Sequence, residues 1–513
     1  MTTTEAKLTK FIYIFSLLLI GVSLVGIFFI LPIGSGDSYV TLVVAKSFQK
    51  GFFYFGNEGP KWGSTSPLQV LLFAPFYRFV QHPILMFKII NLILYFGTGY
   101  IIYQISKKIL PSFYDFLPLV IWFNPYFSFL TVALYDTILF CFLFSILILL
   151  FLNYIESNYK EDKLLFLIFC ISGLLSLARP EGIAISLVII GYLSIKEIIL
   201  DRAIHLRQFL VGLIIFSLIS LPYYILLAFR THQFIPSSVK ARILTAFYRQ
   251  QEGLFLFNLF KFNSIIEGVI LIILLTSLFG IIYFIRKSKK ENIFGYCFVI
   301  LTLLFLLVYI AKDVRYTALI FPLASIFSVY FLNKVLTVFL PSSKRIIVLF
   351  AISLFLSPII TYKYINYYRN MPQWTEDVIF EANGAEFLNN ICRPEDKVFA
   401  YEVQIQYFLN CQTISADGIV GGEILPYLYP PKPGKITEFL LKYKPKYIII
   451  SSAFEYRKEY KNSILEKLYL EDKKIKPKES IFINNIQFVK MINNTKEKIQ
   501  GMNSWDSIYQ VAY

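Results

Sequence analysis

Long apolar runs recur through the first 364 residues of this 513-residue chain and constrain its fold more than any other feature. The first run, from Phe11 to Leu31, has about twenty residues, enough for a helix to cross about 30 Å of hydrocarbon. Hydrophobic residues make up 57% of the chain and charged residues only 16%, which excludes an ordinary soluble enzyme. We therefore predict a polytopic α-helical membrane protein with about eleven transmembrane helices. The later runs lie at roughly 84–106, 116–134, 137–154, 164–178, 183–200, 208–229, 264–285, 292–310, 316–335 and 346–364.

Basic residues in the predicted loops indicate the orientation of the chain, because short loops rich in Lys and Arg stay in the cytoplasm. No small-residue cleavage site follows the first run, so we expect a retained helix with a cytoplasmic N-terminus. The segment Pro67 to Val80, about fourteen residues long, fits an interfacial helix better than a span. An odd number of spans then places the C-terminus outside. The cytoplasmic loops would hold Lys7, Lys10, Lys107, Lys108, Lys160, Lys163, Lys196, Arg202, Arg207, Arg286, Lys287, Lys289, Lys290, Lys344 and Arg345.

The composition changes to that of a soluble domain from residue 365 onward. Hydrophobic spacing predicts strands at Asp396–Tyr401, Tyr447–Ser452 and Ile481–Ile492, and helices at Gly384–Asn390 and Ile436–Tyr443. We therefore predict a small α/β extracytoplasmic domain after the membrane part. The predicted parts are a transmembrane module over 1–364, with outer loops at 32–83 and 230–263, and the α/β domain over 365–513.

Cysteines, histidines and charges narrow the class of function. The five cysteines lack the spacing of a zinc site, and only Cys392 and Cys411 lie outside apolar runs, where they could pair as a disulfide. Three histidines leave little scope for a His-rich metal cluster. Lys and Arg outnumber Asp and Glu by 49 to 33, but no block of like charges forms a nucleic-acid-binding arm. We expect membrane lipids, and no nucleic acid, among the partners.

Polar residues near the membrane gather on the predicted outer face. Asp37 lies a few residues beyond the first span, where a carboxylate is costly unless it is paired or used. It could also simply cap an interfacial helix starting at Ser38. Asp136, Arg179-Pro180-Glu181-Gly182 and Lys312 to Tyr316 mark three further outer helix ends. Each alone fits a cap, a snorkelling Arg or an ion pair, but together they suit a phosphate-bearing substrate and a proton acceptor.

The outer loop 230–263 carries several basic residues against one acid, Glu252, contrary to the usual charge bias of outer loops. Contact with anionic lipid headgroups is one explanation. We favour a bound phosphate or pyrophosphate. The basic and titratable residues are Arg230, His232, Lys240, Arg242, Arg249 and Lys261.

These residues, in this order, resemble the motifs of the polyprenyl-phosphate-dependent GT-C glycosyltransferases. The first loop of that family reads Asp-Asp-Ala-Tyr-Ile, then a glycine, then Gly-Tyr-Thr-Ser-Pro-Leu, which is similar to Gly36 to Val40, Gly51 and Gly63 to Leu68 here. The family's Gly-Met-Glu-Thr looks like Leu134 to Thr137, and its Arg-Pro-Glu-Gly is present as Arg179 to Gly182. Its Gly-x-x-x-Pro-Asn-Thr-x-x-Ala-Lys resembles His232 to Arg242, and its late Arg-Tyr with a following proline resembles Arg315-Tyr316 and Pro322.

The resemblance covers residues 30–360 and is closest to the branch that includes the mycobacterial cell-wall arabinofuranosyltransferases and many uncharacterised bacterial membrane proteins. The chain departs from the family pattern at several positions. Gly36 replaces the first Asp, which leaves Asp37 as the catalytic carboxylate and puts a metal site built on two loop acids in doubt. Asp136 stands in place of Glu, and His232 in place of Gly.

The resemblance implies transfer of a sugar, hexose or pentose, from a polyprenyl-phosphate donor to a hydroxyl of a glycan or lipid acceptor of the cell envelope. The reaction would occur on the outer face of the bacterial inner membrane, with inversion. Asp37 would be the general base and Asp136 a second acidic candidate, while Arg179, Lys240, Arg242 and Arg315 would stabilise the leaving phosphate. The residues expected to position substrate are Tyr39, Trp62, Ser64, Thr65, Glu181, His232 and Tyr316.

Three points stay open at this level. A transporter or flippase for lipid-linked glycans would also use a multi-span body and a basic cavity, although its charges should lie near mid-membrane and on both faces. A polymerase or ligase would instead use a diphosphate-linked glycan donor. No cofactor is certain, and the sequence leaves a divalent metal open.

Overall fold

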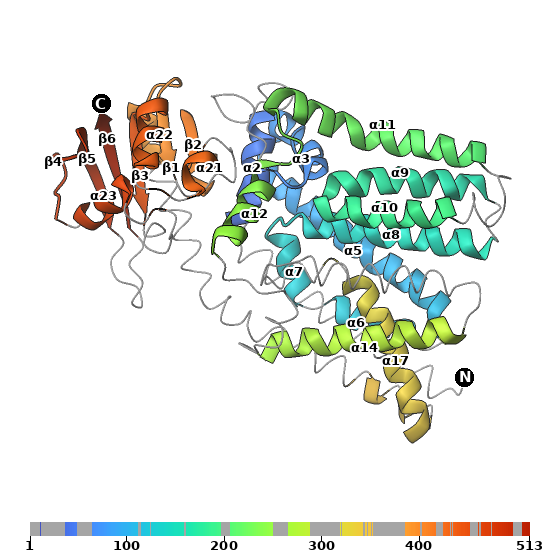
Figure 1. Cartoon of the computed structure of the whole chain (residues 1–513). Helices are drawn as coiled ribbons and strands as arrows, with labels where there is room; N and C mark the ends of the chain where they lie inside the picture. Colours follow the sequence, from blue (N-terminus) through green and yellow to red (C-terminus); the bar gives the residue numbers. More distant parts are fainter. Residues whose placement is uncertain are drawn as a thin grey trace.

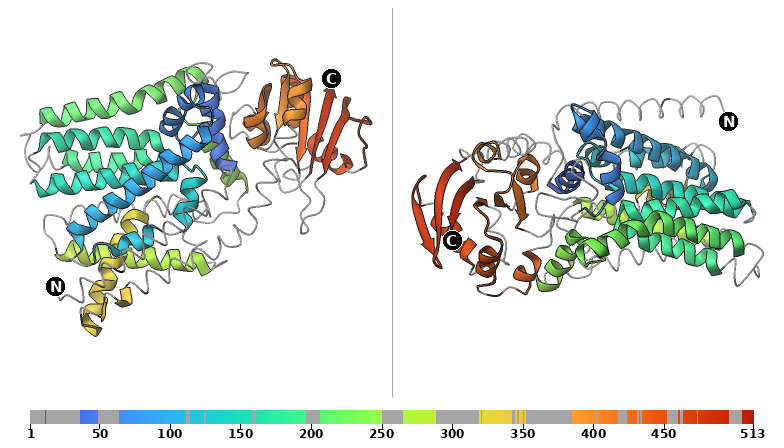
Figure 2. Two further views of the ribbon diagram at one scale, coloured as in Figure 1. Left: turned by 180° about the vertical axis from the view of Figure 1, so that it is seen from behind. Right: turned by 90° about the horizontal axis from the view of Figure 1, so that it is seen from above.

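A computed structural model shows the chain as a helical bundle followed by a sheet domain (Figures 1 and 2). The structure describes residues 11, 36–48, 64–110, 114–123, 125–157, 161–195, 206–249, 265–287, 319, 321–341, 344–345, 347–349, 351, 385–400, 403–416, 424–430, 432, 434–451, 460, 463–472, 474–495 and 505–513. The predicted boundary between residues 364 and 365 lies outside these ranges.

The bundle consists of long apolar helices joined at one end by short ones. Of the described helices, four are long and apolar enough to cross a membrane by themselves: α5, α8, α11 and α17. The helices are α2 (Gly36–Ser47), α3 (Pro67–Phe73), α4 (Phe76–Phe79), α5 (Pro83–Ile109), α6 (Leu117–Trp122), α7 (Pro125–Val132), α8 (Thr137–Glu156), α9 (Asp162–Ala178), α10 (Pro180–Ser194), α11 (Leu206–Thr231), α12 (Ser237–Arg249), α14 (Ile265–Lys287) and α17 (Phe321–Phe339).

The long described helices α5, α8, α9, α10, α11, α14 and α17 coincide with predicted spans, but the run at 116–134 does not form one helix. It folds as α6 and α7, because Pro125 cannot donate a backbone hydrogen bond and its ring clashes with the preceding turn. The segment 67–80 forms the short helices α3 and α4, which confirms that it is not a transmembrane helix. The predicted spans at 11–31, 292–310 and 346–364 lie wholly or mostly outside the described residues, so the predicted count of about eleven stays a prediction.

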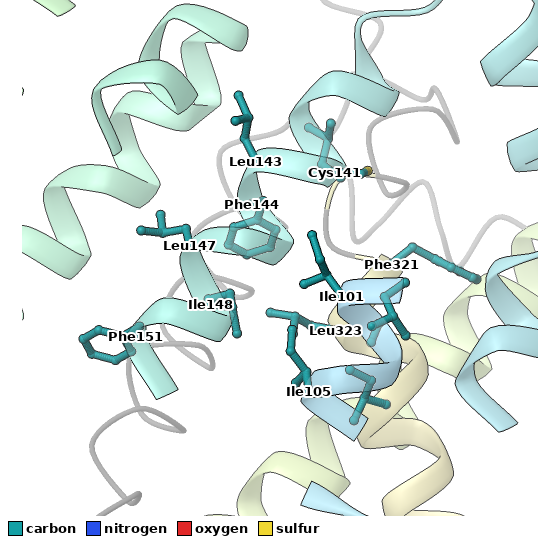
Figure 3. Close-up of a cluster of buried hydrophobic side chains, with 14 of the residues drawn as sticks. Ile101, Ile105, Cys141, Leu143, Phe144, Leu147, Ile148, Phe151, Phe321 and Leu323 are labelled. Atoms are coloured by element: carbon teal, nitrogen blue, oxygen red, sulfur yellow. The ribbon is translucent and has the colours of Figure 1, made fainter. Parts of the chain in front are cut away.

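The helices pack around one apolar core. Helix α8 lies against α5 and α9, α9 packs against α10 and α11, and α14 packs along α17. Figure 3 shows the centre of this core, where Ile101 of α5, Phe144 and Leu147 of α8, and Phe321 and Leu323 of α17 are buried together. A large part of α11 is apolar yet exposed, as expected of a helix that faces lipid.

The C-terminal domain is a six-stranded sheet in the order β2-β1-β3-β6-β5-β4. Strands β1, β2 and β3 are parallel, and the remaining pairs are antiparallel. This arrangement confirms the predicted small α/β domain. The strands are β1 (Lys397–Ala400), β2 (Gln412–Ser415), β3 (Tyr447–Ser451), β4 (Ser480–Ile483), β5 (Ile486–Thr495) and β6 (Trp505–Ala512), and the helices are α20 (Val403–Phe408), α21 (Leu425–Leu428), α22 (Lys435–Tyr443) and α23 (Ile464–Asp472).

The predicted strand at Ile481–Ile492 is in fact a hairpin of β4 and β5. Asn484 and Asn485 connect the strands with φ values of 50° and 65°. A two-residue hairpin turn of this type requires left-handed backbone at both positions, which Asn tolerates better than most residues. The prediction that Cys392 and Cys411 form a disulfide is confirmed, with their Cα atoms 6.3 Å apart.

A buried ion pair lies inside the sheet domain. Lys490 and Asp472 are 0% and 1% exposed at the side chain, and Lys490 Nζ lies 3.1 Å from Asp472 Oδ1. Lys490 also donates to the backbone carbonyl of Asp472 at 2.9 Å, while Ser507 Oγ donates to Asp472 Oδ2 at 3.0 Å and the Tyr509 hydroxyl donates to Oδ1. Partners within the domain therefore satisfy both charges.

Candidate active site

Three of the predicted motif segments meet at one end of the bundle. Asp136 precedes α8, and its carboxylate accepts hydrogen bonds from Thr65 Oγ1 at 3.1 Å and from Arg179 Nη1. On the other side of the guanidinium, Arg179 Nε and Nη2 donate to the two carboxylate oxygens of Glu181 at 3.2 and 3.1 Å. Thr65, Asp136, Arg179 and Glu181 therefore form one connected group, which we call the helix-end cluster.

The position of Arg179 follows from its neighbours in the sequence. A residue before proline disfavours helical backbone, so α9 ends at Ala178 and Arg179 is extended, with φ −161° and ψ 153°. Pro180 then starts α10, since the first helical position needs no backbone N–H. A Cβ atom at Gly182 would lie 2.1 Å from the carbonyl oxygen of Leu175, so only glycine permits this tight corner. The corner directs the guanidinium toward the start of α8.

The turn between α7 and α8, which carries Asp136, is held by polar side chains of three other helices. These side chains, from α2, α3 and α5, reach backbone carbonyls of the turn and of the end of α7. The donor and acceptor pairs are Ser38 Oγ with Ala133 O, Gln69 Nε2 with Leu134 O at 3.4 Å, and Asn91 Nδ2 with Thr131 O at 3.1 Å. Together with Thr65 and Arg179, they fix the turn and its carboxylate from several sides. Such a fixed placement suits a residue that contacts substrate.

The backbone of this region contains two residues in the left-handed conformation. Leu134 has φ 62° and His232 has φ 54°, and in the described part of the bundle they are the non-glycine residues with positive φ. Both stand where the resembling motifs have glycine, which adopts this conformation without steric cost. The agreement supports the residue-by-residue match of these two motifs. Strained backbone of this kind persists mainly at functional sites.

Three buried acceptors near the turn have no hydrogen-bond partner among the residues that the structure describes. They are Ser66 Oγ, Gln69 Oε1 and Asn91 Oδ1, each on a fully buried residue. Gln69 and Asn91 use their amide nitrogens to hold the turn, so their oxygens face elsewhere. Buried polar atoms are normally satisfied, and exceptions cluster where a protein binds water or ligand. The sequence reading missed Gln69 and Asn91, although a buried amide in an apolar helix is a recognised signal of function.

Two predicted roles need correction from this geometry. The guanidinium of Arg179 is engaged by carboxylates at Nε, Nη1 and Nη2, so a phosphate would have to displace one of them to bind. The ring of Tyr39 is fully buried and packs against Tyr407 and Phe408, with centroids 5.5 and 6.2 Å away, so no sugar can stack on it in this arrangement. Arg179 thus contacts Asp136, and Tyr39 contacts the sheet domain.

The remaining predicted site residues are described to different extents. Asp37 lies in the first turn of α2, which begins at Gly36 rather than Ser38, and its side chain is outside the described part. Ser64 is buried and accepts the Ser66 backbone N–H at 3.1 Å. His232 is exposed, and Lys240 is half-buried on α12. The side chain of Arg242, also on α12, and the residues Trp62, Arg315 and Tyr316 lie outside the described part.

The described residues do not provide a metal site. Within the ranges that the structure covers, no group of three or more His, Cys, Asp or Glu side chains is placed to hold a metal ion. Arg179 pairs with both Asp136 and Glu181, so these two acids do not present a shared pair of ligands.

At the opposite end of α8 an ion pair lies near the surface. Glu156 pairs with Lys108 of α5 at 2.5 Å, and both side chains are partly exposed. Lys107 and Lys108 were predicted to lie in a cytoplasmic loop, at the other end of the helices from Asp136 and Arg179. The two ends of the bundle thus differ in burial and in the number of partners.

The chain thus combines a bundle of long apolar helices, short helices at one of its ends and a sheet domain beyond that end (Figure 1). The solved structures to which the chain is similar include ArnT from Cupriavidus metallidurans. The ArnT structure bound to undecaprenyl phosphate has a TM-score of 0.54 and 12% identity, over 85% of this chain and 93% of that chain. The apo ArnT structure has a TM-score of 0.55 and 12% identity, over 96% and 97%. At this identity the likeness establishes the fold.

Comparison with models of known protein families gives no match, and neither does comparison with curated proteins.

Proposed function

We propose that this protein is a glycosyltransferase that moves a sugar from a polyprenyl-phosphate donor to a hydroxyl of a glycan or lipid acceptor. The observation that carries the proposal is the helix-end cluster: Thr65, Asp136, Arg179 and Glu181 come from three separate motifs of the resembling family and contact one another. Residues that are distant in sequence, and chosen for a shared resemblance, are not expected to converge by chance. The ArnT structure bound to undecaprenyl phosphate has a similar fold, which supports a polyprenyl-phosphate partner here.

In the proposed reaction the acceptor oxygen attacks the anomeric carbon, and the bond from that carbon to the phosphate oxygen breaks. Asp37 takes the proton of the acceptor hydroxyl, for which a positioned base contributes about 10²–10⁴-fold in rate. The phosphate leaves as an anion and needs cations rather than a proton, which we assign to Lys240, Arg242 and Arg315. Direct displacement inverts the configuration at the anomeric carbon.

The helix-end cluster would bind the sugar rather than the phosphate. Asp136, held by Thr65 and Arg179, can still accept a hydrogen bond from a sugar hydroxyl, and the acceptors Ser66 Oγ, Gln69 Oε1 and Asn91 Oδ1 lie on neighbouring elements. Further positioning residues in the proposal are Trp62, Ser64, Glu181, His232 and Tyr316. The likeness to the arabinofuranosyltransferase branch leaves a pentose or a hexose as the sugar.

We place the helix-end cluster and the sheet domain outside the cytoplasm of a bacterium, at its inner membrane. The disulfide between Cys392 and Cys411 supports this placement, because such bonds persist in oxidising compartments. The basic pair Lys107 and Lys108 at the opposite end of the bundle supports it too, since loops rich in Lys stay in the cytoplasm.

The test uses purified full-length protein in lipid vesicles with a panel of undecaprenyl-phosphate sugars labelled in the sugar. We expect label to move from at least one carrier to a glycan or lipid acceptor. If intact labelled carrier crosses the vesicle membrane with no transfer, the protein is a flippase and the proposal is wrong. If transfer occurs only from a diphosphate-linked glycan, it is a polymerase or ligase.

A further inference from the structure

Helix α2 lies between the bundle and the sheet domain, and both hold it (Figures 1 and 2). On the bundle side Ser38 Oγ donates to the carbonyl of Ala133, and the Tyr77 hydroxyl donates to the carbonyl of Leu42 at 3.4 Å. On the other side α20 of the sheet domain packs along it. Residues 38–45 of α2 are buried as a result, which is unusual for a helix in an outer loop.

Contacts between α2 and α20 converge on Tyr407. Lys46 Nζ donates to the backbone carbonyl of Tyr407 at 2.7 Å and lies 5.0 Å from the centroid of its ring. The ring of Tyr39 meets the same tyrosine edge to face. The hydroxyls of Tyr77 and Tyr407 lie 3.4 Å apart, so Tyr407 reaches α2 and the α3–α4 segment at once. Charged hydrogen bonds, aromatic packing and a cation over a ring therefore act together at one residue.

The same short helix also reaches into the core of the sheet domain. Ile405 is buried there, and Phe408 packs both against that core and against the cluster formed by α2 and α3. Because α20 packs against both sides, displacement of the sheet domain would move α20, and α20 would move α2.

Burial raises the pKa of Tyr77 and of Tyr407, so both phenols remain neutral donors and acceptors near neutral pH.

We propose that Tyr407 and Lys46 are positioning residues: through their contact the sheet domain fixes the backbone of α2 and so the placement of Asp37 in its first turn. The inference rests on the proposed role of Asp37 as the general base. It gives the sheet domain a part in the chemical step.

The test compares variants of the full-length protein in the sugar-transfer reaction. Lys46→Met removes the donor and the cation, and Tyr407→Ala removes the ring without a change in charge. We expect each to lower kcat about ten- to a hundredfold, because a 1 Å misplacement of a reacting group can cost about 10²-fold. KM for the carrier should stay unchanged. Lys46→Arg, which keeps the cation and the donor, should restore most of the rate.

Lys442→Met is the matched control, because Lys442 is an exposed lysine of the sheet domain that likewise lies over tyrosine rings, those of Tyr427 and Tyr443. It should leave kcat unchanged. Thermal unfolding and the Cys392–Cys411 disulfide, measured by mass spectrometry, should be as in wild type for every variant. Any of three results would overturn the inference. These are failure of Lys46→Arg to restore the rate, a rise in KM without a fall in kcat, and a loss of kcat in Lys442→Met as large as in the test variants. Absence of transfer by the wild-type protein would instead refute the proposed function.

Discussion

Two ion networks in this molecule differ in the charges they join and in how deeply they are buried. In the sheet domain Lys490 and Asp472 form a one-to-one pair, and the hydroxyls of Ser507 and Tyr509 complete it. At the end of the bundle one guanidinium, that of Arg179, contacts two carboxylates, and the side chains of this group are 9–12% exposed. A closed network, in which each charge is buried and matched by a counterion, holds a fold in one arrangement. A partly exposed network beside strained backbone is the kind of structure that persists for function.

The surroundings of the helix-end cluster also include features that are typical of functional sites. Leu134, with its left-handed backbone, lies two residues from Asp136. The side-chain oxygens of Gln69 and Asn91, which have no partner among the described residues, belong to side chains that hold the same turn. Loss of the sheet-domain network should therefore affect stability, and loss of the helix-end cluster should affect transfer.

The largest effect is expected from breaking the closed network. Asp472→Asn would leave the charge of Lys490 buried without its counterion, which should destabilise the sheet domain by about 3–5 kcal/mol. Hydrogen exchange of the β5 and β6 amides measures this change locally. Molecules whose sheet domain remains folded should transfer sugar at the wild-type rate. Lys490→Met in the same background should recover part of the lost stability, and a further loss would argue against the pairing.

A smaller change should separate activity from stability at the helix-end cluster. Arg179→Lys keeps the positive charge but cannot hold two carboxylates with a planar fork of donors. We expect the transfer rate to fall about 10²-fold, as expected of a misplaced group, with little change in the melting temperature. A melting temperature that falls as far as in Asp472→Asn, with activity retained, would remove the distinction between the networks.

The phosphate-binding cations should lie outside the helix-end cluster, since Arg179 is occupied. Arg242→Ala should weaken binding of a polyprenyl phosphate about tenfold, consistent with loss of a charge-assisted hydrogen bond. The acceptor KM should be unaffected, and Arg207→Ala, at the start of α11 in a predicted cytoplasmic loop, serves as the control. Binding of fluorescent polyprenyl phosphate reports the first quantity. Equal losses for carrier and acceptor would argue against a phosphate role.

The smallest expected effect concerns the strained backbone. His232 is exposed, so His232→Gly removes the cost of a left-handed side-chain-bearing residue without loss of buried surface, and should stabilise the protein by about 1 kcal/mol. His232→Ala keeps a Cβ atom and should give no such gain. Thermal unfolding distinguishes the two. The same change at Leu134 is not a clean test, because that side chain is buried.

Sequence patterns predicted the long helices and several sheet elements, because the length, the apolar content and the hydrophobic period of a segment are local properties of the sequence. Pro125 and the pair Asn484-Asn485, which divide two predicted elements, were visible in the sequence and are explained by ordinary backbone rules. Their position at predicted helix ends, and then the resemblance, brought Asp136, Arg179 and Glu181 into consideration before any geometry was known.

What the sequence could not predict is how distant segments meet. Arg179 was expected to bind phosphate, yet it is engaged by two acids, one of which belongs to another helix. Tyr39 was expected to position substrate, yet Tyr407 of the sheet domain packs against its ring. Such contacts depend on tertiary packing between elements, which hydrophobic periodicity does not encode.

The central claim is that the end of the bundle bearing Asp37 performs sugar transfer. Asp37→Asn is nearly isosteric and removes only the base, so single-turnover transfer from a labelled polyprenyl-phosphate sugar should fall about 10²–10⁴-fold. Carrier binding and the melting temperature should remain as in wild type, and Asp115→Asn, at an acid near Lys107, should transfer normally. A rate for Asp37→Asn close to that of wild type would contradict the account.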